Sequence, residues 1–346
     1  MTDLSLRHGR PGAVMVPGLR RVLGLVVTLV VLVVVLVLSV MIGSTAIAPS
    51  TVWDALFSPS AGIDEFAVRD FRWPRTIAGL VVGLALGLSG ALIQALTRNP
   101  LADPGILGVN AGASFAVTVA VGLFGIRDVQ GYMWFAFAGA LIVTLVVLAL
   151  GSTRQGSSPV VMVLAGVCIG AVLGGAREAL QITNPAAFDA MRSWNGGSIV
   201  GRPLEIVLPV LPLLVVGLVL AFAVTGPLNA LALGNELAVA QGVRLGPTRV
   251  LSVVALTLLA GGATAIAGPI AFIGLMVPHI ARWIVGPHQR WIFAYSALLA
   301  PILLLGSDIL GRVVMQPGEI PVGIVTAFVG APLLVWLVRR KNASGL

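Results

Sequence analysis

Long stretches without a charged side chain constrain this sequence more than any other feature. The first, Val22–Ile42, runs for 21 residues with neither charge nor proline. At about 1.5 Å per helical residue, it spans roughly the 30 Å hydrocarbon layer of a bilayer. Further stretches without Asp, Glu, Lys or Arg, several of them containing proline, lie at 76–97, 104–126, 131–151, 159–176, 206–226, 250–268, 270–281, 291–307 and 320–338. The pattern predicts an all-α membrane protein with about ten transmembrane helices.

Composition excludes the ordinary soluble classes. Of the 346 residues, 58% are hydrophobic and only 10% are charged, whereas about a quarter of the residues in soluble domains are charged. The single cysteine, Cys168, provides neither a disulfide framework nor a cysteine-based metal site. The first apolar stretch is longer than the roughly 7–15 residues of a signal-peptide core, so we expect it to be retained as the first helix.

The distribution of charge predicts the orientation in the membrane. If ten helices place both termini on one side, the segments on that side hold 13 basic residues and three acids, and the opposite segments hold seven basic residues and nine acids. Loops rich in Lys and Arg face the cytoplasm. We therefore expect cytoplasmic segments at 1–21 and 339–346 and one transmembrane domain at 22–338. The net charge of +8 is explained by contacts with anionic lipid, so no nucleic acid is expected as a partner.

The position of the only lysine limits what this chain can do with ATP. A phosphate-binding Walker loop needs Gly-x-x-x-x-Gly-Lys followed by Ser or Thr, and Lys341 is not in such a motif. If ATP drives transport, a separate polypeptide must hydrolyse it. Almost every acid falls in a loop or at a helix end, which argues against a proton relay. We expect no catalytic residue, no bound cofactor and no metal ligand in this chain, and His279 is interpreted as structural.

One predicted cytoplasmic connection has the features of a short helix. Residues 231–243 read Leu-Ala-Leu-Gly-Asn-Glu-Leu-Ala-Val-Ala-Gln-Gly-Val. We expect Asn235 to cap the helix through its side-chain oxygen and Gly242 to adopt the left-handed conformation just past its end. A short helix on the cytoplasmic face could be bound by a partner protein. An ordinary amphipathic connector explains these residues equally well on these grounds alone.

Glycines recur at four-residue spacing in two of the apolar stretches. Such spacing lets helix backbones approach closely in lipid, which favours packing faces over a lining of the transport pathway. The residues are Gly79, Gly83 and Gly87 in one stretch and Gly166, Gly170 and Gly174 in another. A weak similarity between residues 90–94 and 268–273 also suggests an inverted repeat, an arrangement common in transporters.

Four further segments carry longer motifs. They are Arg-Trp-Pro-Arg-Thr at 72–76, the run 89–112 containing Asn-Pro-Leu-Ala-Asp-Pro-Gly, the run 268–282 containing Val-Pro-His-Ile-Ala-Arg, and Glu-Ile-Pro-Val-Gly-Ile-Val-Thr-Ala at 319–327. In this order, and over about residues 40–340, they resemble the membrane permeases of bacterial ABC importers for ferric siderophores, haem and cobalamin, the FecCD family.

The resemblance implies a type II importer permease with inverted repeats in the bacterial plasma membrane. It implies a permease dimer of identical or paralogous subunits, two cytoplasmic ATPases that bind ATP and Mg²⁺, and an extracytoplasmic substrate-binding protein. The expected function is translocation of ferric siderophores, with haem or cobalamin as alternative substrates. An ion-gradient-driven carrier is a different class of alternative, and it would require functional acids at the membrane midplane.

The resemblance also assigns site residues. Outward-facing arginines of the family receive carboxylates of the binding protein, and the matching positions are Arg72, Arg75 and Arg312. Guanidinium suits this role because it remains charged and binds carboxylates bidentately. The helix near 231–243 matches the family's coupling helix, which enters a groove on the ATPase. The coupling residues are then Gly234, Asn235, Glu236, Ala240 and Gly242.

One pair departs from the family pattern. Arg177 and Glu178 lie where the family is usually apolar or small. Because neighbouring residues on a helix do not face each other, a mutual ion pair is not assured. We interpret them as an outer-end pair that reaches toward the loops, with a role in the transport pathway as the alternative.

Overall fold

Helices make up nearly all of the computed structural model, which describes residues 17–43, 45, 47–57, 62–153, 156–157 and 159–339. Most of the predicted terminal segments, 1–21 and 339–346, therefore lies outside the described residues. The elements in chain order are α1 (Pro17–Met41), α2 (Pro49–Phe57), α3 (Ile63–Phe66), the π-helical turn η1 (Ala67–Arg72), α4 (Trp73–Thr97), the 3₁₀ turn η2 (Pro104–Leu107), α5 (Val109–Gly122), α6 (Val129–Gly151), the two-residue strands β1 (Ser152–Thr153) and β2 (Gly156–Ser157), α7 (Pro159–Thr183), α8 (Pro185–Trp194), α9 (Leu204–Val207), α10 (Leu211–Ala223), α11 (Thr225–Ala232), α12 (Asn235–Ala240), α13 (Leu245–Ala267), α14 (Ile273–Val285), α15 (Gln289–Val314) and α16 (Val322–Arg339).

The apolar helices agree with the ten stretches predicted from the sequence. In the described part of the chain, six helical segments are long and apolar enough to cross a membrane, and α10 with α11, bent by 45° between them, makes a seventh if the two are counted as one span. Three shorter apolar helices, α5, α14 and α16, account for the remaining stretches. The predicted all-α membrane fold with about ten helices is therefore confirmed.

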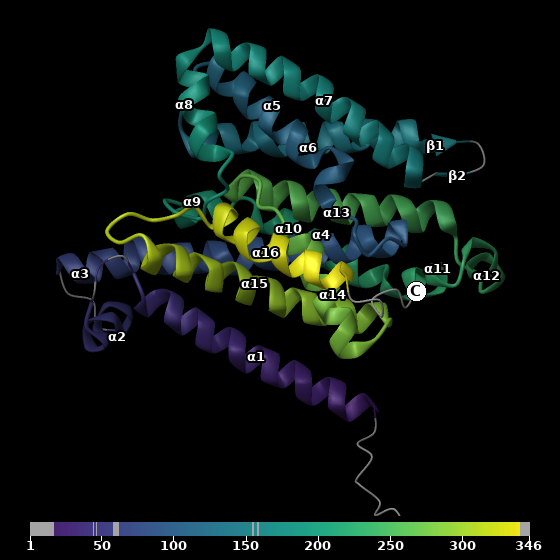
Figure 1. Ribbon diagram of the computed structural model, residues 1–346, viewed down its shortest axis with the longest axis horizontal. Helices are drawn as coiled ribbons and strands as arrows, with labels where there is room; N and C mark the ends of the chain where they lie inside the picture. The colour runs from purple at the N-terminus through teal and green to yellow at the C-terminus, as the bar shows by residue number, and fades with distance from the viewer. Residues whose placement is uncertain are drawn as a thin grey trace, which may run out of the picture.

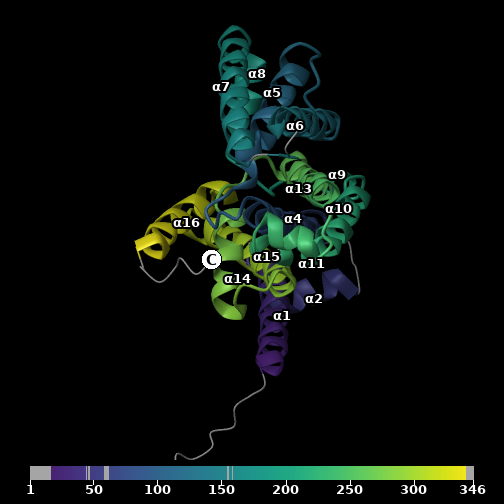
Figure 2. The same cartoon turned by 90° about the vertical axis from the view of Figure 1, so that its right-hand side faces the viewer.

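Helix α4 lies at the centre of the bundle. In Figures 1 and 2 it runs between α13 on one side and α15 on the other, while α5, α6, α7 and α8 form a group above them and α1 flanks the bundle below. Burial follows this arrangement, since 78% of the α4 span is buried but only 17% of the α1 span and 11% of the α7 span. The exposed faces of α1 and α7 must therefore be covered by lipid or by another subunit.

Small residues on α4 allow its close approach to α15. A Cβ added at Gly83 would lie 2.6 Å from the Cα of Pro301, and one at Gly87 would lie 2.5 Å from the carbonyl oxygen of Ser296. Gly79 contacts Leu305 in the same way. These contacts confirm the packing interpretation for α4. On α7 it holds for Gly166, which packs on the Ile106 carbonyl, but not for Gly174, whose surroundings are open to 4 Å.

The first of the two segments with the weak internal similarity, 90–94, meets the residues directly after the second, 268–273. A Cβ on Gly90 of α4 would collide with the backbone of Gly274, at the start of α14. Beside this contact, Gln94 Nε2 donates a hydrogen bond of 2.8 Å to the carbonyl oxygen of Leu275, and Arg282 Nη2 donates to Gln94 Oε1 at 3.4 Å. The side chain of Gln94 thus satisfies a backbone carbonyl near the point where α14 begins inside the bundle.

Replacing Gly83 with alanine should destabilise the folded chain by about 1–3 kcal/mol, because the added methyl group would overlap the α15 backbone. Gly306→Ala on α15 is the matched control, since nothing lies within 4 Å of its added Cβ and alanine favours the helix. Thermal unfolding of the detergent-solubilised protein measures both. Equal midpoints for the two variants would contradict the close-packing account.

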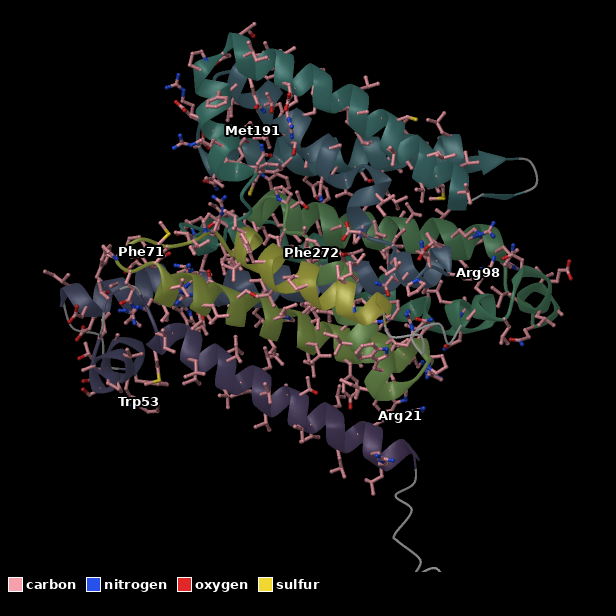
Figure 3. All side chains as sticks on the ribbon, in the orientation of Figure 1. Arg21, Trp53, Phe71, Arg98, Met191 and Phe272 are labelled. Atoms are coloured by element: carbon pink, nitrogen blue, oxygen red, sulfur yellow. The ribbon has the colours of Figure 1, made fainter. Side chains whose placement is uncertain are left out.

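The predicted inner and outer segments separate to opposite ends of the molecule. Arg21, Arg98 and α12 lie at one end, while Trp53, Phe71, α2, α3 and the α15–α16 connection lie at the other (Figures 1 and 3). We call these the inner and the outer end, after the orientation that the charges predict. The separation agrees with an arrangement in which both ends of the bundle face water and the apolar faces between them contact lipid.

Candidate docking and coupling sites

The three arginines assigned to docking surround one cavity at the outer end. The cavity measures about 280 Å³ and is lined by Gly43, Thr45, Ala67, Phe71, Arg72, Arg75, Val200, Gly201, Arg312 and Glu319. Arg72 ends the turn η1, Arg75 lies in the first turn of α4, and Arg312 lies in the last turn of α15. The structure therefore brings together residues that are about 240 positions apart in the sequence.

The centre of this cluster is a carboxylate that the sequence analysis did not single out. Asp308 is fully buried and accepts hydrogen bonds from two guanidinium groups. Its Oδ1 accepts from Arg75 Nη2 at 2.7 Å and from Arg75 Nε at 3.2 Å, and its Oδ2 accepts from Arg312 Nε at 3.0 Å and from Arg312 Nη2. The fork-like geometry of guanidinium permits both pairs, so two cations share one buried carboxylate.

Two of the arginines also cap the C-terminal end of α1. The last carbonyl groups of a helix have no partner within it. Arg312 Nη1 donates to the carbonyl oxygens of Ser39 and Ile42, both at 2.7 Å, and Arg72 Nη1 donates to that of Met41 at 2.7 Å. A cation at this position also opposes the negative end of the helix dipole. Arg72 and Arg312 therefore fix the outer end of α1 against α4 and α15.

Local sequence explains how the cluster is built. Arg72 and Arg75 are three residues apart, and Asp308 and Arg312 are four residues apart, so each pair shares one face of its helix. Gly43 leaves room for the guanidinium of Arg72, because a Cβ there would collide with it. The spacing of Asp308 and Arg312 in an otherwise apolar helix is the signal that could have identified the buried pair from the sequence.

Arg75 has a second carboxylate partner at the wall of the cavity. Its Nη1 donates to Oε2 of Glu319 at 2.6 Å, and Glu319 lies in the connection between α15 and α16. The side chain of Glu319 is 23% exposed, compared with 9% for that of Arg75. This is the part of the cluster that an incoming group can reach, and the sequence analysis did not assign Glu319 to it.

The burial of the arginines corrects one feature of the sequence-based description. We expected outward-facing arginines on a rim, whereas Arg72, Arg75 and Arg312 are only 6%, 8% and 1% exposed and are bonded within the chain. The reason is that the α1 carbonyls and Asp308 require cationic partners. Their role in docking remains a prediction, and access to them is through the cavity.

A short helix, α12, lies at the inner end within the range 231–243 that was predicted for the coupling helix, and its coupling role stays a prediction. Its end is closed as expected, because Gly242 has φ +82° and its N–H donates to the Val239 carbonyl at 2.8 Å. The N–H of Val243 donates to the carbonyl of Ala238 at 2.9 Å, which completes a Schellman motif. The short helix is therefore held in a defined shape.

The predicted cap at Asn235 is wrong. Asn235 is the first residue of α12, and Gly234, with φ +111°, is the cap and makes no side-chain hydrogen bond. The positive φ of Gly234 turns the chain sharply between α11 and α12, so the helix begins one residue earlier than expected. The side chain of Asn235 instead accepts a hydrogen bond of 3.4 Å from Arg249 Nη2 of α13, which ties α12 to a membrane span.

The exposed surface of α12 carries apolar side chains, although the helix lies at the inner end of the molecule, which faces water. Leu237 and Val239 are 54% and 55% exposed, and Glu236 and Ala240 are exposed beside them, whereas Ala238 is fully buried. Exposed apolar groups that gather on a well-defined short helix are typical of a surface that a protein partner covers.

The pair that departs from the family pattern does form an ion pair. Arg177 Nη2 and Glu178 Oε1 are 3.5 Å apart, near the outer end of α7. The side chain of Glu178 is 68% exposed, so the pair lies on the uncovered face of that helix.

Comparison with known proteins agrees with this geometry. The FecCD transport family matches residues 31–340. The ferric enterobactin transport system permease protein FepD of Escherichia coli (strain K12) is 47% identical over 335 residues, which cover 96% of this chain and 97% of that protein. The probable siderophore transport system permease protein YfiZ of Bacillus subtilis (strain 168) is 37% identical and covers 87% of this chain and 91% of its own. A solved metal-chelate type ABC transporter in an inward-facing conformation superposes with a TM-score of 0.80 at 26% identity, covering 92% of this chain and 99% of that chain.

Proposed function

The chain belongs to the FecCD transport family of ABC transporter permeases, and from this premise we propose that it translocates a ferric siderophore. The observation that supports this substrate most strongly is the 47% identity, over nearly the full length, to a ferric enterobactin permease. The second relative is also described as a siderophore permease. Haem and cobalamin remain the alternatives within the family, whereas a carrier driven by an ion gradient has no support among these relatives.

ABC permeases work with an ATPase and a binding protein, and we propose a specific arrangement for this one. Two permease chains, identical or paralogous, would stand side by side in the inner membrane with both termini in the cytoplasm. Two ATPase subunits would bind ATP and Mg²⁺ beneath α12, and a binding protein would deliver the substrate at the outer end. The α7 span is only 11% buried in the single chain, and the large exposed face that this leaves supports a second subunit.

The mechanism that this arrangement supports is alternating access. The binding protein would place carboxylates at the outer cavity of Arg72, Arg75 and Arg312, and ATP binding and hydrolysis would move α12 with Gly234, Asn235, Glu236, Ala240 and Gly242. Because α12 is tied to α13 through Asn235 and Arg249, its displacement would reach a helix that packs directly on α4. No bond in the substrate is made or broken.

Uptake into proteoliposomes tests the substrate. The permease would be reconstituted with the ATPase and binding protein of its importer, and uptake of ferric enterobactin, a ferric hydroxamate, haem and cobalamin would be compared with and without ATP. We expect ATP-dependent accumulation of a ferric siderophore. Transport of haem or cobalamin in preference to both iron complexes would overturn the proposal.

Docking of the binding protein should depend on Arg75. We expect Arg75→Gln to weaken docking by at least about tenfold, since one partner of a shielded charge pair is lost. The wild-type affinity should fall as salt is raised, because exposed charges approaching the cavity are screened. Binding of the labelled binding protein to permease in nanodiscs measures this. Arg202→Gln, which removes a cation from the loop before α9 at the same end, is the control, and equal losses in the two variants would contradict the assignment.

A further inference from the structure

The three arginines of the outer cavity differ in the free-energy cost of breaking the hydrogen bonds to their present partners. The Nη groups of Arg72 are bonded to carbonyl oxygens at and just past the end of α1, and Arg312 divides its donors between α1 carbonyls and Asp308. Releasing these bonds would uncap a helix or leave the buried Asp308 without its full set of partners, which is costly. Neither Arg72 nor Arg312 can therefore exchange one of these partners for an external ligand without a large cost in free energy.

Arg75 is different because one of its two carboxylate partners is replaceable. Asp308 is fully buried and belongs to α15, but Glu319 is partly exposed and lies outside any helix. Within the described part of the chain, the ion pair with Arg75 is the one hydrogen bond of the Glu319 side chain, and it uses only Arg75 Nη1. The remaining bonds of Arg75, from Nε and Nη2 to Asp308, could persist if Glu319 moved away.

We propose that Glu319 is a built-in competitor of the binding protein, which occupies Arg75 in the free permease and gives way to a carboxylate of the binding protein on docking. The inference rests on the proposed docking function and deepens it, because it identifies the position where the exchange takes place. The partner must supply a carboxylate on a protruding side chain, since the exchange replaces one carboxylate by another at Arg75 Nη1. The charge of the cluster is then unchanged around the buried guanidinium groups.

The exchange also links docking to the helix that follows. Glu319 is three residues before α16. The backbone that follows it is anchored by Ile320 N, which donates to the Gly311 carbonyl at 3.3 Å, and by Gly323 N, which donates to the Gly197 carbonyl at 3.0 Å. In the free chain Glu319 additionally ties this connection to α4 through Arg75. Displacement of its side chain releases that third tie, so the start of α16 is freed from α4 only when the binding protein is seated.

The experiment measures the affinity of the importer's binding protein, labelled with a fluorophore, for permease held in nanodiscs with its ATPase. We expect Glu319→Gln to bind about five- to tenfold more tightly than the wild type, because a neutral amide competes less well for guanidinium than a carboxylate does. Glu319→Asp keeps the negative charge but shortens the side chain, so it should also bind more tightly, by a smaller factor. Thermal midpoints of the variants confirm that each is folded.

Asp70→Asn is the matched control, because it removes an exposed negative charge at the same end, from the turn that contains Arg72. It should change affinity less than twofold. If Glu319→Gln binds no more tightly than Asp70→Asn, while Arg75→Gln still loses docking, the competitor role is overturned and the docking site stands. If Arg75→Gln docks normally, the docking site and the competitor role are both overturned.

Discussion

Asp308→Asn should destabilise the folded permease by about 3–5 kcal/mol, because it removes one partner of a buried ionic cluster and leaves charge uncompensated. The carboxylate holds Arg75 and Arg312 together, and an amide oxygen cannot neutralise either cation. Arg312 would then be poorly placed to cap α1, so the loss should spread to the packing of the first helix. Thermal unfolding in detergent and the amount of protein in the membrane fraction measure the effect.

Asp70→Asn is the control for this experiment as well, because an exposed carboxylate that takes no part in the ion pairs of Asp308 should change stability by less than about 0.5 kcal/mol. The double variant Asp308→Asn with Arg312→Gln provides a sharper test. Asp308→Asn leaves Arg312 without its carboxylate, and Arg312→Gln removes that unpaired cation. The loss of unfolding free energy in the double variant should therefore be smaller than the sum of the two single losses by about 0.5–3 kcal/mol. Additive losses would mean that the two side chains do not act on each other as the structure indicates.

The fold could be predicted because its main determinant is local. A bilayer requires every backbone group to be satisfied within the segment, so a charge-free stretch long enough to cross the membrane has few alternatives to a helix. The ten stretches, from Val22–Ile42 to 320–338, were therefore recognisable without tertiary information. Their exact ends were not: the charge-free stretch 159–176 stops before Arg177, whereas α7 continues to Thr183, because a charged pair at the outer end of a span can continue the helix.

The docking cluster could be predicted only in part, because its chemistry depends on contacts across the bundle. Arg72, Arg75 and Arg312 were assigned by family resemblance. Nothing local to these residues indicates that Ser39 and Met41 would need them as caps, since α1 is more than 30 residues from the nearest of them. Asp308 and Glu319 were counted only as outer charges, because their pairing with Arg75 spans more than 230 residues.

Gly242→Val should reduce substrate uptake by at least about tenfold while ATP hydrolysis by the partner subunits continues. A β-branched residue is a genuine outlier at φ +82°, so the chain must rearrange where the Schellman motif closes α12. The exposed Leu237 and Val239 would then be presented in a different orientation to the ATPase. A contact that transmits movement fails when its geometry changes, even if the two proteins still bind. Uptake and ATPase rates in the same proteoliposomes measure the two activities separately.

Gly246→Val is the matched control for this change. Both glycines lie near the inner end, and an added Cβ meets nothing within 4 Å at either one, so the variants add the same side chain to equally open space. They differ in the backbone, because Gly246 lies in the first turn of α13 with an ordinary helical conformation. Valine has a somewhat higher helix propensity than glycine, and uptake should stay within about twofold of the wild type. Loss of uptake in both variants would indicate general damage to this region, and normal coupling in Gly242→Val would show that the shape of α12 does not transmit the motion.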